Sequence, residues 1–264
     1  QDEYSPQCRF VEFYLNRNYM GVYLLVEHVK VAPHRVNLVK SDSSFLFEKT
    51  RETDDDDIVF ESSLNCIFNI KYPKAPNQET INRLKTHVNK FENKLSNDSI
   101  TLSDWIDIDD FVRYYWIQEF SKNIDGAFGR SIFITWQFNE PFKMGPVWDF
   151  DVAYGIGNTR MMSPNDWYVR YQGWYQYLIK NKIFKERVNQ YWKDNKELFV
   201  DLADSIASAS NLLKRASKNE FKRWPVLEND EIWPFVDSYS SYEATIDSLK
   251  FWTTRRIQWI DEHL

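Results

Sequence analysis

Three aspartates stand at the ends of apolar stretches in this chain. Asp149 and Asp151 close an apolar run within Gly145-Pro-Val-Trp-Asp-Phe-Asp-Val-Ala-Tyr-Gly155, which reads as a buried strand, and Asp125 follows an apolar helical pattern in Asn123-Ile-Asp-Gly126. Carboxylates in such places need a cation or several hydrogen bonds. The pattern therefore predicts a metal-dependent site at which the three acids converge.

A helix and a hairpin are expected to position these acids. Asp107 or Asp109 is suited to cap a helix that runs to about residue 122 and delivers Asn123 and Asp125 at its end. Strands over residues 131–138 and 142–148, turned at Asn139-Glu-Pro141, predict a hairpin. Its second strand would run straight into Asp149, so the acids would flank the hairpin.

The first part of the chain is predicted to be β-rich. Alternating apolar residues indicate a hairpin over residues 8–29, turned at Asn16-Arg-Asn-Tyr-Met-Gly21, and further strands over residues 45–49, 58–61 and 66–72. The acidic tract Asp54-Asp-Asp-Asp57 lacks the spacing and the turn glycine of a calcium loop. A solvated hairpin tip is therefore favoured there.

The pattern switches from strand to helix after Tyr72-Pro73. Apolar residues recur at helical spacing over residues 81–95, and the chain from about residue 170 is predicted to be helical, with a long last helix around residues 246–260. We therefore place a boundary near residue 75, between a β-rich lobe (1–74) and a mainly helical lobe (75–264) that carries the acids. The segment 156–171, with Met161 and Met162, reads either as a flexible loop over the site or as an ordinary connector.

Composition indicates a globular α+β protein. The chain has 264 residues, of which 43% are hydrophobic and 17% aromatic, so a substantial core can form. A formal net charge of -6 gives no general attraction to nucleic acid. No apolar run is long enough to span a membrane, so we expect no transmembrane segment. The start, Gln1-Asp-Glu-Tyr4, lacks Met and the order of a signal peptide, so we expect a mature or trimmed form.

The two cysteines give no metal-site pattern. Cys8 and Cys66 each fall in a predicted strand. Because cysteine often packs in cores, two buried free thiols are favoured over a disulfide.

The order of an acid, a short hairpin and a second acid is that of a protein-kinase catalytic lobe. In such a lobe the first acid orients the acceptor hydroxyl and the second holds Mg²⁺ against the nucleotide phosphates. Phosphoryl transfer concentrates negative charge, and carboxylate oxygens are suited to hold the divalent ion that offsets it. The sequence contains neither His-Arg-Asp nor Asp-Phe-Gly, so the set is not that of an ordinary kinase.

Four motifs resemble a known family. The motifs are Tyr14-Leu-Asn-Arg-Asn-Tyr-Met-Gly-Val-Tyr-Leu-Leu-Val-Glu27, Ile70-Lys-Tyr-Pro73, Asn123-Ile-Asp125 and Gly145-Pro-Val-Trp-Asp-Phe-Asp151 with Gly155. Together they look like the CotH family, which comprises spore-coat-protein-H-like atypical kinases. The resemblance runs in order over about residues 10–157. Each motif alone is weak, whereas their joint occurrence is specific.

The resemblance implies a two-lobed, atypical protein-kinase-like fold with a small antiparallel β lobe and a larger, mainly helical lobe. It implies ATP with Mg²⁺ or Mn²⁺ as cofactor and the phosphorylation of protein Ser or Thr hydroxyls, in a secreted or cell-envelope setting. On this mapping Asp125 is the catalytic acid, and Asp149 or Asp151 binds the metal; which of the two does so stays open. Glu27 would lie near the linker where adenine docks, or would be a solvent-facing charge at a strand end.

Two departures from the kinase pattern concern charged residues. The position five residues after the catalytic acid, where a metal-binding asparagine is expected, holds Arg130. An arginine cannot ligate Mg²⁺, but its forked donors can contact phosphate. Asn123 or Asn158 could substitute as the ligand. The phosphate-contacting lysine would lie on a strand upstream of this sequence, so we expect an incomplete or rebuilt small lobe, with Lys71 as either the surviving phosphate ligand or a packed strand-end lysine.

Three functional classes follow from these observations. The first is an active atypical kinase with a protein substrate. The second is a catalytically inactive relative that binds a protein or cell-surface partner, which Arg130 and the missing strand favour. The third, a glycan hydrolase, is disfavoured because Asp149 and Asp151, two apart on an extended strand, would point to one face only about 7 Å apart.

Overall fold

The computed structural model describes residues 4–98, 100–156, 163–227 and 239–264. These residues form a mixed α+β structure with antiparallel sheets. Asn158, a candidate ligand, and Met161 and Met162 of the predicted covering loop or connector lie outside the described residues.

The chain divides into two compact units. Unit 1 comprises Gln1–Pro6, His28–Phe150 and Trp167–Trp192, and unit 2 comprises Gln7–Glu27, Asp151–Asp166 and Lys193–Leu264. The boundary predicted near residue 75 falls inside unit 1, because strands from both sides of that residue pair in one sheet.

Unit 1 is built on a five-stranded antiparallel sheet with the order β4-β5-β3-β6-β7. Its strands are β3 (Ser44–Thr50), β4 (Val59–Glu61), β5 (Ile67–Tyr72), β6 (Ile132–Gln137) and β7 (Lys143–Met144). The central strand β3 pairs with β5 on one side and with β6 on the other, and Lys49 lies opposite Ile132. This pairing brings the end of β3 to the loop that precedes β6.

The second strand of the predicted site hairpin is much shorter than expected. Strand β7 ends at Met144, and residues 145–150 have no regular structure, so the prediction of a strand that runs straight into Asp149 is wrong. Gly145 N still donates to Phe133 O, but Pro146 has no N–H and cannot continue the ladder. An added Cβ on Gly145 would lie 2.6 Å from Phe133 Cβ, so the backbone at residue 145 lies too close to Phe133 to carry a side chain.

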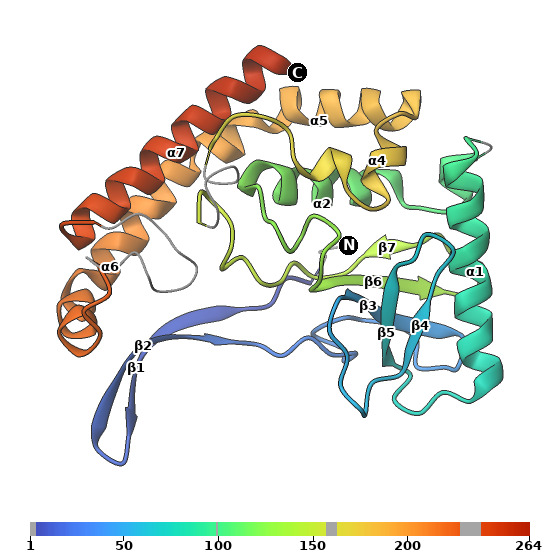
Figure 1. The fold of residues 1–264 in the computed structure, drawn as a ribbon, viewed down its shortest axis with the longest axis horizontal. Coiled ribbons are helices and arrows are strands. Elements are labelled where there is room, and N and C mark those ends of the chain that lie inside the picture. The colour runs from blue at the N-terminus through green and yellow to red at the C-terminus, as the bar shows by residue number, and fades with distance from the viewer. Residues whose placement is uncertain (1–3, 99, 157–162, 228–238) are drawn as a thin grey trace. The chain divides into compact units, whose positions relative to one another are not determined.

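Helix α1 (Gln78–Ser96) lies alongside this sheet (Figure 1). It begins three residues before the predicted apolar pattern because Asn77 caps it, accepting a hydrogen bond from Thr80 N. Its buried face packs among aromatic rings, and Phe91 contacts Phe142 and Trp174 with ring centroids 5.5 and 4.9 Å apart. Aromatic packing against the sheet thus forms the core of unit 1.

Helix α2 (Ile108–Ser121) confirms the predicted helix that ends before the site. Asp107 is its N-cap and accepts from Asp110 N, and Lys122 ends it in a left-handed conformation. The helix is buried on several sides, and Trp116 Nε1 donates to Val188 O of α5 (Lys182–Val200). The remaining short elements of unit 1 are η1 (Leu102–Asp104), η2 (Val169–Tyr171) and α4 (Tyr175–Leu178).

Unit 2 contains the predicted first hairpin, formed by β1 (Cys8–Leu15) and β2 (Asn18–Val26). Its turn is only Asn16-Arg17, both left-handed, so β2 begins earlier than predicted. Helix α6 (Leu202–Arg223) and the residue after it hold the outer edge of β2: Glu220 accepts from Val22 N, and Trp224 Nε1 donates to Met20 O.

The last helix, α7 (Tyr242–His263), also belongs to unit 2 and begins at the N-cap Ser241. Arg256 on α7 is fully buried and donates from Nη1 to Pro164 O and Asp166 O. The predicted helix around residues 246–260 is therefore confirmed, with a longer extent at both ends.

Both cysteines are free thiols, as the favoured alternative predicted. Cys66 is buried, and burial raises the pKa of its thiol to about 11. Cys8 is exposed rather than buried, because it begins a strand of a two-stranded sheet. Within the described parts of the chain, no helix combines the length and apolar character that crossing a membrane requires.

Candidate active site

The loop after α2 places Asp125. The chain leaves the helix at Lys122, and the Asp125 carbonyl accepts hydrogen bonds from both Gly129 N and Arg130 N. This closes a tight turn over residues 125–130. Gly126 is required by packing, since an added Cβ would lie 1.9 Å from Gln118 Oε1. The turn holds Asp125 in a buried position, with 4% of its surface exposed.

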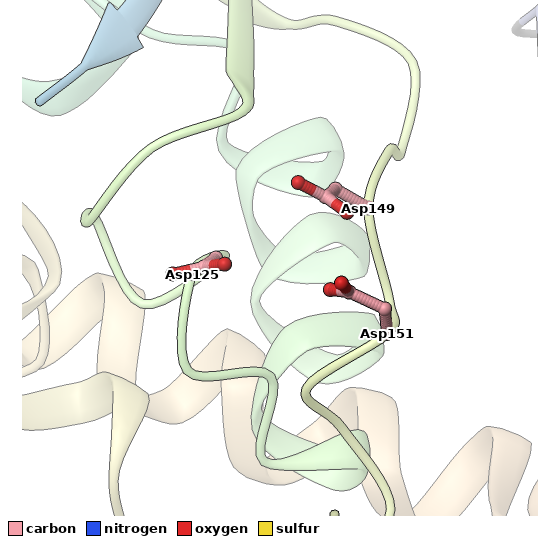
Figure 2. A group of neighbouring side chains, drawn as sticks. All are labelled: Asp125, Asp149 and Asp151. Carbon is pink, nitrogen blue, oxygen red and sulfur yellow. The ribbon is translucent and has the colours of Figure 1, made fainter. Parts of the chain in front are cut away.

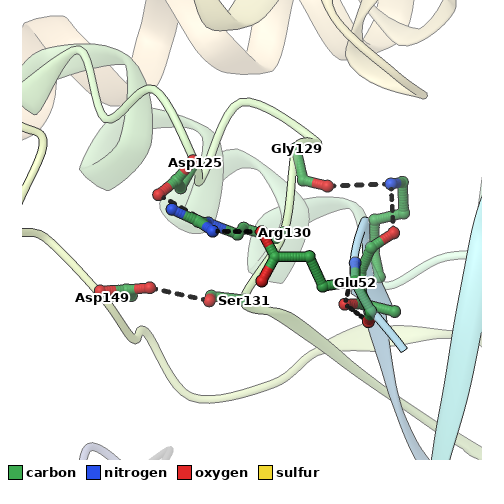
Figure 3. A network of polar contacts seen from close by, with 8 residues as sticks. Glu52, Asp125, Gly129, Arg130, Ser131 and Asp149 are labelled. Carbon is green, nitrogen blue, oxygen red and sulfur yellow. Dashed lines mark hydrogen bonds and ion pairs between the residues drawn. The ribbon is translucent and has the colours of Figure 1, made fainter. Parts of the chain in front are cut away.

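Asp149 is held in an unusual backbone conformation. Its φ is 63°, in the left-handed region that residues other than glycine, asparagine and aspartate seldom adopt. Asn123 Nδ2 donates to the Asp149 carbonyl at 3.0 Å, and Ser131 Oγ donates to Asp149 Oδ2 at 2.9 Å (Figure 3). The extended-strand spacing predicted for Asp149 and Asp151 therefore does not apply.

The three predicted aspartates come together. One carboxylate oxygen from each of Asp125, Asp149 and Asp151 lies within 4.8 Å of the other two, and Figure 2 shows the three side chains around one space. Asp151 belongs to unit 2, but it is joined to Asp149 through Phe150 alone, so the local chain keeps it near. Asp125 is buried, Asp149 half-buried and Asp151 exposed.

Three carboxylates this close repel one another unless a cation is present. A neutral amide oxygen that could also bind a cation lies two residues before Asp125 in the sequence. Asn123 is fully buried, and its Oδ1 has no hydrogen-bond partner among the residues described. Carboxylate and amide oxygens are ligands that Mg²⁺ and Mn²⁺ accept, so the donor set fits a hard divalent cation.

Arg130 supplies positive charge beside the aspartates. Its Nε lies 3.0 Å from Asp125 Oδ2, and its Nη1 lies 3.1 Å from Glu52 Oε1 (Figure 3). The hydrogen bond to Asp125 raises the pKa of Arg130 further above its already high value. The guanidinium group thus neutralises part of the charge of Asp125 and links the site loop to the segment after β3.

Lys71 and Glu27 each have local partners of their own. Lys71, on β5, forms an ion pair with Glu48 at 3.0 Å and lies 3.8 Å from Asp57. Glu27 lies in unit 2, where its carboxylate accepts from Gln7 N. Their roles toward a nucleotide remain predictions.

Sequence reasoning missed three residues that the structure brings to the site loop. Ser131 contacts Asp149, and Lys49 Nζ donates to Gly129 O at 2.9 Å. The guanidinium of Arg51 packs on Gly129, where an added Cβ would lie 2.9 Å from Nη2. The available signal was a lysine near the end of β3 and an arginine directly after it. Its meaning depends on the pairing of β3 with β6.

Comparison with known proteins gives one family. The family model described as CotH kinase protein matches residues 3–260, nearly the whole chain. The search of curated proteins returned no match.

Proposed function

Since this chain belongs to the CotH family, we propose that it is a metal-dependent, kinase-like phosphotransferase that moves phosphate from ATP to Ser or Thr hydroxyls of proteins. The observation that carries the proposal is the convergence of Asp125, Asp149 and Asp151 within 4.8 Å, with Asp125 buried. A two-lobed kinase-like arrangement and a secreted or cell-envelope setting are parts of the proposal that rest on the family resemblance.

Asp149 and Asp151 would hold the divalent ion, and Asn123, whose Oδ1 has no hydrogen-bond partner among the described residues, would be a candidate for a further oxygen ligand. The bound ion would supply electrostatic stabilisation of the charge on the transferred phosphoryl group. Ser131 and Asn123 would orient Asp149, because one binds its carboxylate and the other its carbonyl. The left-handed backbone of Asp149 is consistent with strain retained at a functional site.

Asp125 would act as the proton acceptor. In the transfer step the acceptor hydroxyl oxygen bonds to the γ-phosphorus of ATP, and the bond from that phosphorus to the β–γ bridging oxygen breaks, so that ADP leaves. The hydroxyl proton passes to the Asp125 carboxylate and from there to water. Arg130, hydrogen-bonded to Asp125, would hold this carboxylate in place.

A second candidate function is partner binding without transfer. The ion pair between Arg130 and Asp125 favours it. Arg130 stands where the kinase pattern has a metal-binding asparagine, and its Nε lies 3.0 Å from Oδ2 of Asp125, the proposed proton acceptor. In that case the family site would be kept as a recognition surface.

The test is calorimetric binding of ATP with and without Mg²⁺ or Mn²⁺, combined with mass-spectrometric detection of phosphate transfer to a protein mixture. We expect divalent-dependent binding that Asp149→Asn and Asp151→Asn weaken, whereas Asp125→Asn keeps binding and abolishes transfer. Asp55→Asn, an exposed acid outside the site, is the matched control. Binding without any transfer by the wild type would favour the second candidate, and no divalent-dependent binding would contradict the proposed kinase-like activity.

A further inference from the structure

Lys49 is a buried cation without a carboxylate partner among the described residues. Only 8% of its surface is exposed, and its Nζ donates to two carbonyls, Thr50 O at 2.8 Å and Gly129 O at 2.9 Å. An ammonium group has three donors, so one N–H has no protein acceptor within the described parts of the chain. Because a buried charge is costly unless it is paired, this site is suited to receive an anion.

Arg51 adds a second cation two residues further along the same strand end. It is exposed, and its guanidinium lies against Gly129, as the close approach of Nη2 to an added Cβ there shows. Among the described residues it has no hydrogen bond or ion pair that would occupy its donors. Two cations therefore contact Gly129 from the end of β3 and the residue after it: Lys49 Nζ donates to the Gly129 carbonyl, and the Arg51 guanidinium packs against the Gly129 backbone.

Arg130 adds the third cation from the loop itself. It follows Gly129 directly, and it is half-buried between Asp125 and Glu52 (Figure 3). Two kinds of charged group thus meet at the turn over residues 129–130. Lys49 and Arg51 contact Gly129, and the Arg130 guanidinium contacts Asp125, one of the three carboxylates that fit a divalent ion.

We propose that Lys49, Arg51 and Arg130 form one anion-binding cluster that holds a polyphosphate chain beside the aspartates. The ligand class is a polyphosphate because a chain of phosphates offers several charged groups, so that it can contact the cluster at one end and a carboxylate-bound divalent ion at the other. The inference rests on the proposed function where it assigns this polyphosphate to ATP. It gives the phosphate-contacting role to Lys49, whose Nζ contacts the site loop at Gly129, rather than to Lys71, whose ion pairs are with Glu48 and Asp57.

The experiment uses the whole chain and tripolyphosphate in the presence of EDTA, so that binding does not depend on the metal or on transfer. We expect calorimetric binding that Arg51→Gln and Lys49→Met each weaken about tenfold or more, because each removes a charge-assisted contact. Lys94→Gln, which removes an exposed cation on α1, should leave the affinity unchanged. Lys49→Met could alter the loop at Gly129, to which Lys49 is hydrogen-bonded. Arg51 is exposed, so Arg51→Gln should leave the fold intact and tests the cluster independently.

Further arms identify the source of the phosphates. ATP and tripolyphosphate should compete, whereas inorganic phosphate at equal concentration should displace little of either. Asp149→Asn should keep metal-free binding and lose only the Mg²⁺-dependent gain. The cluster would be overturned if tripolyphosphate did not bind without metal, or if wild type and Arg51→Gln bound it with equal affinity. Mg²⁺-dependent ATP binding by the aspartates is a separate measurement and could still be observed in that case. Binding with the expected losses but no phosphate transfer would instead leave the cluster standing and count against the kinase activity.

Discussion

The five-stranded sheet of unit 1 and the β1–β2 hairpin of unit 2 are both antiparallel, yet they obtain stability in different ways. The sheet buries Phe45, Phe47 and Phe68 completely, whereas the hairpin leaves large apolar side chains partly exposed, among them Phe10, Phe13 and Leu25. A two-stranded ribbon alone is marginal in water. The hairpin therefore depends on hydrogen bonds from α6, while the sheet that carries the site depends on a packed aromatic core.

The strongest test of this contrast compares the same truncation in both places. Phe68 is 0% exposed and its ring lies 5.5 Å from that of Phe47, whereas Phe13 is 41% exposed. Phe68→Ala should lower the free energy of unfolding by about 3–5 kcal/mol, and Phe13→Ala by under about 1 kcal/mol. Urea unfolding followed by Trp fluorescence measures both. Similar losses would show that the hairpin contributes a core of its own.

The second test compares two glutamates. Glu92 is fully buried and accepts hydrogen bonds from four donors, which are Ser62 Oγ, Ser63 Oγ, Leu64 N and Trp174 Nε1. Glu92→Leu leaves these donors without an acceptor and should cost about 3 kcal/mol. Glu220→Leu removes one acceptor, for Val22 N, and should cost about 1 kcal/mol. Native-state hydrogen exchange should show faster exchange at Val22 in the second variant only.

A third test uses pH. His87 lies between Trp105 and Trp136, and burial lowers the pKa of its imidazole from 6.5 to about 4. Between these values the unfolded chain binds a proton that the folded protein does not, so stability is present above pH 6.5 and falls as the pH drops toward 4. Because the ring is only partly buried, we expect a loss of about 1 kcal/mol. In His87→Gln this component should be absent, so the difference between the two urea-unfolding curves isolates it from the carboxylates. A pH-independent difference would contradict the prediction.

The smallest expected effect concerns the hairpin edge. Trp224→Phe keeps an aromatic ring under the Arg223 guanidinium but removes the hydrogen bond from Nε1 to Met20 O. We expect a loss of about 0.5–1 kcal/mol in the free energy of unfolding, since one neutral hydrogen bond contributes about that much. Thermal unfolding followed by circular dichroism should detect it. A loss as large as that of Phe68→Ala would mean that the edge bond controls the whole unit.

Local signals predicted most of the elements and the three acids. Helical spacing located α1, and a capping aspartate located the start of α2. The acids drew attention because charged side chains at the ends of apolar runs are unusual. The length of β7 was mispredicted because the apolar run continues past Pro146, which cannot pair. Cys8 was misplaced because a strand pattern does not say whether a sheet covers it.

The parts of the site that the sequence did not disclose depend on contacts between distant segments. Lys49 reaches Gly129 only because β3 pairs with β6, and this pairing brings together residues 80 positions apart. Ser131 acquires its role from the turn of the chain at Asp149. No periodicity within a single segment carries that information.

The left-handed backbone of Asp149 affects how substitutions at this position should be read. A β-branched or long side chain there would disturb the backbone as well as remove the carboxylate, so lost activity would not by itself identify a metal ligand. Asparagine and glycine tolerate this conformation and lack the charge. They separate the two contributions of Asp149, whereas an alanine scan would merge backbone strain with lost chemistry and overstate the importance of the side chain.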